Sequence, residues 1–243
     1  MRGYQTFVET PCEVLRDKLF FCLVVLATTL PSHAQEDYKK IFGRDYEQAA
    51  AFLAKEKWIG ERINGYGLPV DEVLAVVFPE LIRFNSIQDK IEVLALESLY
   101  IQYGKSYANF SIGRFQIKPS FVEMLEKKIL ESKSPIAVWL KLTPSDTVQN
   151  ESNRHKRLQK MKRLESAVDY VCAFYAWTEK TQSYWPNLET KIKYLATAYN
   201  AGFYLQENEI KKLQNKKFFH VGWVPTKKFC YADVSWCYYE SLL

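Results

Sequence analysis

Glu80 is a side chain whose neighbours in the sequence fit acid–base chemistry. It lies near the end of an apolar helical stretch, with Val76 and Val77 one turn before it and Phe84 one turn after it. Apolar neighbours disfavour a charged carboxylate, so such a group keeps its proton closer to neutral pH and can act as a general acid. The structural alternative is an ion pair with Arg83 on the flank of the same helix.

Two further motifs carry polar groups that could bind a ligand. The spacing GxxQxxP, formed by Gly113, Gln116 and Pro119, permits a tight turn that brings the glutamine amide and the nearby backbone against a ligand. An ordinary turn explains the same spacing. The segment AYNAG, residues 198–202, ends a helix rich in small residues, and a helix C-cap with a buried tyrosine also accounts for it. The functional argument therefore depends on the three motifs together.

In their order along the chain, the three motifs resemble those of the soluble lytic transglycosylases, a branch of the lysozyme-like superfamily that cleaves peptidoglycan. The resemblance covers residues 68–202 and rests on a glutamate in an ExxxFN context, then GxxQxxP, then AYNAG. It implies a mainly α-helical, lysozyme-like fold with one catalytic carboxyl that acts first as acid and then as base. It also implies cleavage of the bond between N-acetylmuramic acid and N-acetylglucosamine without a second carboxylate.

The resemblance also implies roles for individual residues. Glu80 is the expected acid, because it shares the ExxxFN context and comes at a helix end, where a carboxyl can face a cleft. Glu97 is the alternative, because the Glu97-Ser98 pair stands nineteen residues before Gln116, which is closer to the family's usual spacing. Tyr199 is expected to hydrogen-bond or orient the acid. The residues expected to bind the sugar strand are Gly113, Phe115, Gln116 and Asn200.

Other interpretations stay open. A muramidase would use the same acid with water as the nucleophile, and nothing local separates it from a transglycosylase. A non-catalytic wall-binding or scaffold protein with a degenerate lysozyme-like fold is the main alternative, since Arg114 replaces the usual apolar residue after the glycine. Nucleic-acid binding is disfavoured, because the 33 basic and 28 acidic residues are mostly interleaved and form no basic stripe.

The elements that must position these residues are expected to be helices. Apolar periodicity predicts helices over 46–63, from Pro69 to about residue 84, and over 86–103, 119–129, 158–180 and 188–199. The polar segments 143–157 and 215–228 are predicted to be loops. Because the chain has no repeat, low-complexity tract or Pro/Gly-rich linker, residues 35–243 are predicted to form one domain.

Residues 1–34 have the pattern of a cleavable export signal. Arg16 and Lys18 precede the apolar run Leu19–Leu30, and a small-x-small cleavage site follows, ending at Ala34. As a helix this run would span about 18 Å, against about 30 Å for the core of a bilayer. We therefore expect no stable membrane span. The mature protein is expected in the periplasm or cell envelope, with peptidoglycan glycan strands as its partner.

The composition excludes disordered and fibrous classes, since 48% of the 243 residues are hydrophobic and 15% are aromatic. Three cysteines follow the signal segment, and an odd number cannot pair completely within one chain. Cys230 and Cys237 could close a small loop, or all three, Cys172 included, could be small buried hydrophobes. No metal-ligand spacing of Cys or His is present, so the sequence predicts neither a metal nor another cofactor.

Overall fold

The computed structural model describes residues 36–84, 96–182, 184–221 and 227–243. Contacts divide the chain into two units, Met1–Asp37 and Tyr38–Leu243. The predicted signal over 1–34 lies outside the described residues, as does the first part of the helix predicted over 86–103. No helix in the described part of the chain is both long and apolar enough to cross a membrane.

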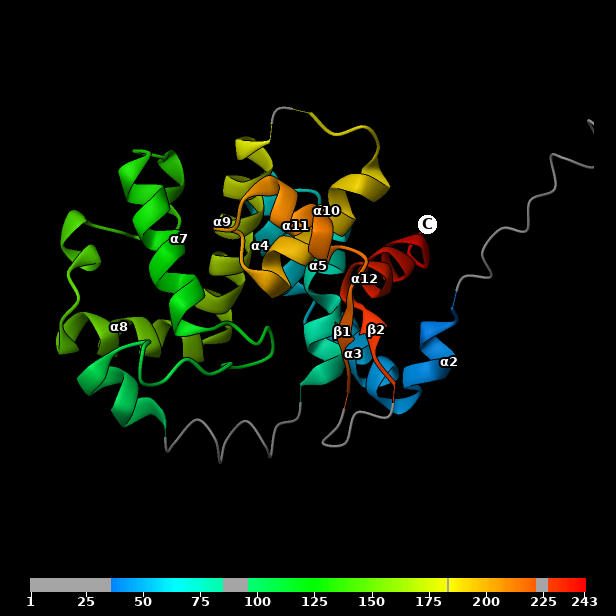
Figure 1. Cartoon of the computed structure of the whole chain (residues 1–243), viewed down its shortest axis with the longest axis horizontal. Coiled ribbons are helices and arrows are strands. Elements are labelled where there is room, and N and C mark those ends of the chain that lie inside the picture. The colour runs from blue at the N-terminus through cyan, green and yellow to red at the C-terminus, as the bar shows by residue number, and fades with distance from the viewer. Residues whose placement is uncertain (1–35, 85–95, 183, 222–226) are drawn as a thin grey trace, which may run out of the picture. The chain divides into compact units, whose positions relative to one another are not determined.

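The second unit is mainly α-helical, as predicted (Figure 1). Its α-helices are α2 (Tyr38–Phe42), α3 (Arg44–Lys55), α4 (Trp58–Gly65), α5 (Val70–Arg83), α7 (Pro119–Glu131), α8 (Glu151–Lys162), α9 (Leu164–Thr181), α10 (Leu188–Ala201), α11 (Glu207–Leu213) and α12 (Tyr231–Glu240). Residues 96–103 are also helical. The short 3-10 helices η1 (Pro135–Val138) and η2 (Pro144–Thr147) follow α7. The strands β1 (Lys217–Phe219) and β2 (Phe229–Cys230) pair antiparallel.

Helix α5 is the centre of the packing around the candidate site, because it contacts α3, α4, α9, α10 and α12. Its residues from Val73 to Ile82 are almost all buried, as expected for a helix that is apolar on every side. Asp71 and Glu72 lie in its first turn, where carboxylates stabilise the positive end of the helix dipole. Glu80 is therefore carried near the end of a helix that other helices surround.

Two stretches predicted as single helices are each divided in two. The stretch 46–63 forms α3 and α4, which separate at Glu56, where ψ is 54° and the carboxylate accepts a hydrogen bond of 2.9 Å from Trp58 Nε1. The stretch 158–180 belongs to α8 and α9, which separate because Arg163 has an extended backbone, with φ −89° and ψ 124°. Helix α8 also begins inside the predicted loop 143–157, because the Asn150 side chain caps it by accepting from the Asn153 N–H.

The C-terminal segment adds structure that the periodicity did not predict. Strand β1 lies within the predicted loop 215–228, and α12 contacts both α5 and α10. The Phe219 ring of β1 is buried against the ring of Tyr231, at 5.6 Å between centroids. The Cys230 thiol is free and donates to the carbonyl of Gln214 at 2.8 Å, so it forms no disulfide with Cys237. The alternative interpretation expected three buried cysteines, and Cys172 and Cys230 are buried whereas Cys237 is partly exposed.

Candidate active site

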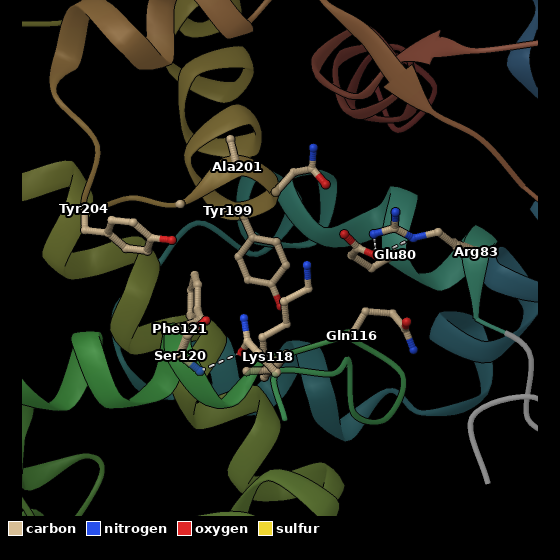
Figure 2. Close-up of a pocket in the computed structure, with 13 residues that line it drawn as sticks. Glu80, Arg83, Gln116, Lys118, Ser120, Phe121, Tyr199, Ala201 and Tyr204 are labelled. Carbon is tan, nitrogen blue, oxygen red and sulfur yellow. Dashed lines mark hydrogen bonds and ion pairs between the residues drawn. The ribbon is translucent and has the colours of Figure 1, made fainter. Parts of the chain in front are cut away.

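Glu80 is buried and ion-paired. Its side chain is only 3% exposed, although Arg83, one turn later on α5, is 32% exposed. The Arg83 guanidinium donates to Glu80 Oε2 from Nε at 3.0 Å and from Nη2 at 2.5 Å (Figure 2). Glu80 is therefore buried among apolar groups and forms the ion pair with Arg83 that was the structural alternative.

Two buried tyrosines from other helices lie near Glu80. The Tyr199 hydroxyl of α10 donates to the Phe115 carbonyl at 2.7 Å, and the Tyr231 hydroxyl of α12 donates to the Val76 carbonyl at 3.3 Å. Burial, and then the charge of Glu80, raise the pKa of both tyrosines well above the usual range. Both hydroxyls therefore stay protonated and neutral beside the carboxyl. The Tyr199 hydroxyl was expected to orient the acid, and it instead bonds to the backbone of the GxxQ segment.

The GxxQ segment forms a tight turn. Ile112 and Ile117 form an antiparallel bridge, with N–H to carbonyl distances of 2.9 and 3.2 Å. Between them Gly113 has φ +68° and Gln116 has φ +49°, both in the left-handed region. Gln116 Nε2 donates to the Gly113 carbonyl at 2.9 Å, so the glutamine side chain stabilises the turn to which it belongs.

The AYNAG segment ends α10 in a sharp turn. Gly202 has φ +122°, and its N–H bonds to the Ala198 carbonyl at 2.9 Å. A Cβ at this position would lie 2.8 Å from the Tyr204 ring. The backbone conformation therefore favours glycine here, and a Cβ would also displace the Tyr204 ring. The turn directs Asn200 and Tyr204 toward one side of the helix end, where both line the same pocket.

The three motifs meet around a pocket of about 140 Å³ (Figure 2). Its lining residues are Glu80, Arg83, Asn109, Gln116, Ile117, Lys118, Ser120, Phe121, Tyr199, Asn200, Ala201, Gly202 and Tyr204. The pocket reaches the surface, since Lys118 is exposed and Tyr204 is half-exposed. Among the lining residues, Glu80 is the one acid, and Arg83 and Lys118 are cations.

The structure brings four predicted site residues together and leaves three outside the pocket. Those in the pocket are Glu80, Gln116, Tyr199 and Asn200. Glu97 instead pairs with Lys162 Nζ at 2.7 Å. The Phe115 side chain is buried in the core, and its contribution is the carbonyl that Tyr199 binds. Gly113 provides the turn and is not part of the pocket wall.

Other residues at the site were not predicted from the sequence. Lys118 and Asn109 line the pocket, and the Asn109 side chain accepts a hydrogen bond from the Ser120 N–H at 3.1 Å. Lys118 stands inside the GxxQxxP motif, between Gln116 and the proline, so its position in the sequence could have identified it. For Asn109 the sequence offers no comparable signal.

Arg114, the departure from the family pattern, ties the turn to the core helices. Its guanidinium lies 4.5 Å from the ring centroid of Phe52 in α3 and 4.4 Å from that of Phe84 at the end of α5. A cation held between two aromatic faces is stabilised by about 0.5–2 kcal/mol for each contact. The arginine therefore holds the GxxQ turn beside Glu80 through two cation–π contacts. An apolar residue at this position could not make them.

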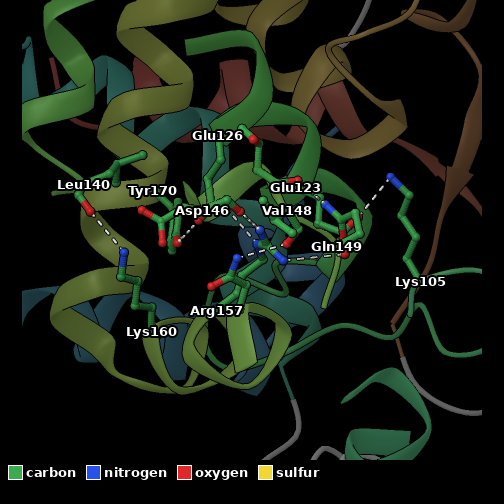
Figure 3. Close-up of polar contacts among 12 residues, drawn as sticks. Lys105, Glu123, Glu126, Leu140, Asp146, Val148, Gln149, Arg157, Lys160 and Tyr170 are labelled. Carbon is green, nitrogen blue, oxygen red and sulfur yellow. Dashed lines mark hydrogen bonds and ion pairs between the residues drawn. The ribbon is translucent and has the colours of Figure 1, made fainter. Parts of the chain in front are cut away.

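A second cluster of buried polar groups lies between α7, α8 and α9 (Figure 3). Arg157 Nε donates to Glu126 at 2.7 Å, and Arg157 Nη1 donates to the Tyr100 hydroxyl at 3.2 Å. Glu126 also accepts from Tyr170 at 2.6 Å, and Glu123 accepts from Tyr100 at 3.0 Å. Because these groups satisfy one another, we assign the cluster to folding and not to chemistry.

The described residues contain no group of three or more His, Cys, Asp or Glu placed to hold a metal ion. The side chains that line the pocket carry a carboxyl, two cations, amides, phenols and the hydroxyl of Ser120. Comparisons with protein-family models, with curated proteins and with solved structures found no match.

Proposed function

We propose that this protein is an exported peptidoglycan lytic transglycosylase with a lysozyme-like fold, in which Glu80 is the single acid and base. The observation that supports this proposal is the meeting of Glu80, Gln116, Tyr199 and Asn200 around one pocket, although they come from three separate segments. A buried carboxyl beside amide groups in a surface pocket suits protonation of a glycosidic oxygen. Export by residues 1–34 is part of the proposal, because peptidoglycan lies outside the cytoplasmic membrane.

In the proposed reaction, Glu80 gives its proton to the oxygen that joins N-acetylmuramic acid to N-acetylglucosamine. The bond between the muramyl anomeric carbon and this oxygen breaks, and N-acetylglucosamine leaves with the proton on its hydroxyl. The resulting carboxylate accepts the proton of the muramyl 6-hydroxyl, whose oxygen bonds to the anomeric carbon and closes a 1,6-anhydro ring. If water attacks in its place, the same acid makes the protein a muramidase with a reducing product. The amides of Gln116 and Asn200, which line the pocket, would hold sugar groups. Glu97 is the weaker candidate, because it lies outside the pocket lining and pairs with Lys162.

A second function, non-catalytic binding of the cell wall, is favoured by one observation. The Glu80 carboxyl pairs with Arg83, and a general acid must carry a proton when it reacts. A protein that only bound glycan strands would keep this ion pair permanently.

The test of the enzymatic proposal is Glu80→Gln, which keeps the side-chain size and removes the acid. We expect release of soluble muropeptides from purified sacculi to fall by about 10²–10⁴-fold, the usual range for losing a general acid. Mass spectrometry of the wild-type products identifies the nucleophile, since an anhydro end lacks one water relative to a reducing end.

Glu97→Gln is the matched control, since it removes a carboxylate that pairs with Lys162 away from the pocket. It should keep near-wild-type release. Loss of release in Glu97→Gln with full activity in Glu80→Gln would move the acid to Glu97. Wild-type activity in both variants would reject a carboxyl acid at this site, and sedimentation with sacculi would then test the wall-binding function.

A further inference from the structure

Arg83 and Glu80 form an unequal pair. The carboxyl is fixed, since it is 3% exposed and lies on a helix buried on all sides, whereas the guanidinium is 32% exposed. Arg83 is the last residue of α5, and Phe84 after it has an extended backbone. Arg83 is therefore the more exposed member of the pair and lies at the end of the helix, whereas the carboxyl is enclosed.

Arg83 has a second contact outside the ion pair. Its guanidinium carbon lies 5.6 Å from the ring centroid of Phe219 in β1, within the range of a cation–π interaction. Arg83 also lines the pocket, together with the exposed Lys118. An anion entering the pocket would thus meet two cations and one already neutralised acid.

Of the charged and titratable groups around Glu80, Arg83 is the one whose contact with the carboxyl a ligand could replace. From α10 and α12 the carboxyl faces Tyr199 and Tyr231, which burial keeps protonated by raising the pKa of each. The pocket wall adds Lys118. Burial acts to lower the pKa of Arg83, but the Glu80 carboxylate outweighs it and raises that pKa, so Arg83 stays charged. An anion that binds the Arg83 guanidinium would therefore compete with Glu80 for this contact.

We propose that Arg83 is a positioning residue that exchanges its contact with Glu80 for a carboxylate on the bound glycan, so that Glu80 takes up a proton from solvent only when an anionic strand occupies the pocket. This inference rests on the proposed function. It assigns the substrate class as glycans that carry carboxylates near the cleaved bond, and it reconciles the ion pair with a role for Glu80 as acid. Uncharged glycans of the same backbone would leave the pair intact and be poor substrates.

The experiment compares native peptidoglycan strands with strands whose carboxylates have been converted to amides. Both binding and muropeptide release are measured, for the wild type, for Arg83→Gln and Arg83→Lys, and for Lys156→Gln as a charge-matched control on the exposed face of α8. We expect the wild type to bind amidated strands about tenfold more weakly, the usual value of one charge-assisted hydrogen bond. Arg83→Gln should bind both strands equally, Arg83→Lys should recover part of the preference, and Lys156→Gln should behave as the wild type.

The pH dependence of activity distinguishes this role of Arg83 from a purely structural one, which would leave that dependence unchanged. A general acid loses activity as pH rises through its titration, and without the guanidinium a buried carboxyl holds its proton to higher pH. The alkaline limb of Arg83→Gln should therefore lie at higher pH than that of the wild type. Equal binding of native and amidated strands by the wild type would overturn the inference, as would superimposable pH profiles. Failure of the proposed function would differ, since no strand would be cleaved at all, and the binding preference would still test Arg83.

Discussion

At the level of single residues, the Tyr199 hydroxyl joins two of the three motifs directly. It donates to the carbonyl of Phe115, which lies 84 positions earlier in the chain, and the tyrosine is 7% exposed. The bond holds the GxxQ turn against α10 and so keeps Gln116 and Asn200 on the same pocket. Tyr199 thus acts on the shape of the pocket through its hydrogen bond.

Tyr199→Phe removes this bond and leaves the buried Phe115 carbonyl without its donor. We expect the free energy of unfolding to fall by about 1–2 kcal/mol, measured by urea denaturation followed by circular dichroism. Tyr204→Phe is the control, because Tyr204 is half-exposed at the same helix end. Its stability should stay within about 0.5 kcal/mol of the wild type. Equal stability of the two variants would mean that the Phe115 contact contributes nothing.

At the level of elements, the GxxQ turn depends on two left-handed residues. Gly113 adopts this conformation without cost, and Gln116 adopts it at φ +49°, although its side chain disfavours it. The Arg114 guanidinium between Phe52 and Phe84, together with the Tyr199 bond, supplies the compensating interactions. The turn is therefore held by α3, α5 and α10 together.

Gly113→Ala tests the backbone of this turn. A Cβ would meet only the Met161 carbonyl, at 3.8 Å, so the expected cost of about 1–2 kcal/mol is conformational and not steric. Gly60→Ala in α4 is the matched control, because its backbone is helical and its Cβ would make an ordinary contact of 3.4 Å with Val70. It should gain about 0.5–1 kcal/mol. The free energy of unfolding of both variants is measured by denaturant titration. An unchanged value for Gly113→Ala would contradict the left-handed conformation of this turn.

Some elements could be predicted from the sequence because their signals are local. Helices α7 and α10 match their predicted ranges closely, since Pro119 starts the first and the Asn187 side chain caps the second. The first part of helix α8, residues 151–157, was predicted as a loop, because its buried face includes Arg154 and Arg157. These arginines look solvated in a linear sequence, and only carbonyls and carboxylates from distant segments make their burial possible.

The site also has features that could be predicted from the sequence and features that could not. The order of the motifs placed Glu80, Gln116, Tyr199 and Asn200 together, and these four do line one pocket. The partner of Tyr199 and the aromatic contacts of Arg114 could not be predicted, because both depend on residues remote in the chain. The apolar neighbours of Glu80 and the i, i+3 spacing to Arg83 were both readable in the sequence, but they were treated as alternatives, and the structure shows a buried carboxyl that is also paired.

At the scale of the whole molecule, the many tyrosines lie in the core as well as on the surface. Several buried tyrosines have raised pKa values, and burial is the first cause in each: Tyr100, Tyr170, Tyr175, Tyr199, Tyr231 and Tyr238. In the unfolded chain a tyrosine ionises near pH 10. The folded state therefore binds more protons than the unfolded state above that pH.

Stability should be insensitive to these groups below about pH 10 and should fall above it, by about 1.4 kcal/mol per pH unit for each buried tyrosine. The direction follows because the folded pKa lies above the unfolded one, so the contribution is complete below the unfolded pKa and is lost as pH rises through the folded value. Tyrosinate absorbance and far-UV circular dichroism, followed together, should show a late step of ionisation that coincides with loss of helix. Full ionisation with the helices intact would contradict this burial.

The cluster around Arg157 has a consequence for how this protein can change over evolutionary time. The Arg157 guanidinium serves Glu126 and Tyr100, whereas Glu123 also pairs with Lys105 Nζ at 3.1 Å, so losing the arginine alone would leave the buried Glu126 carboxylate without its cation. Descendants that lose the arginine would be expected to lose Glu126 with it, and by the same argument descendants that lose Arg83 would be expected to lose Glu80. Substitution should therefore be coupled between α7 and α8 at one pair and within α5 at the other.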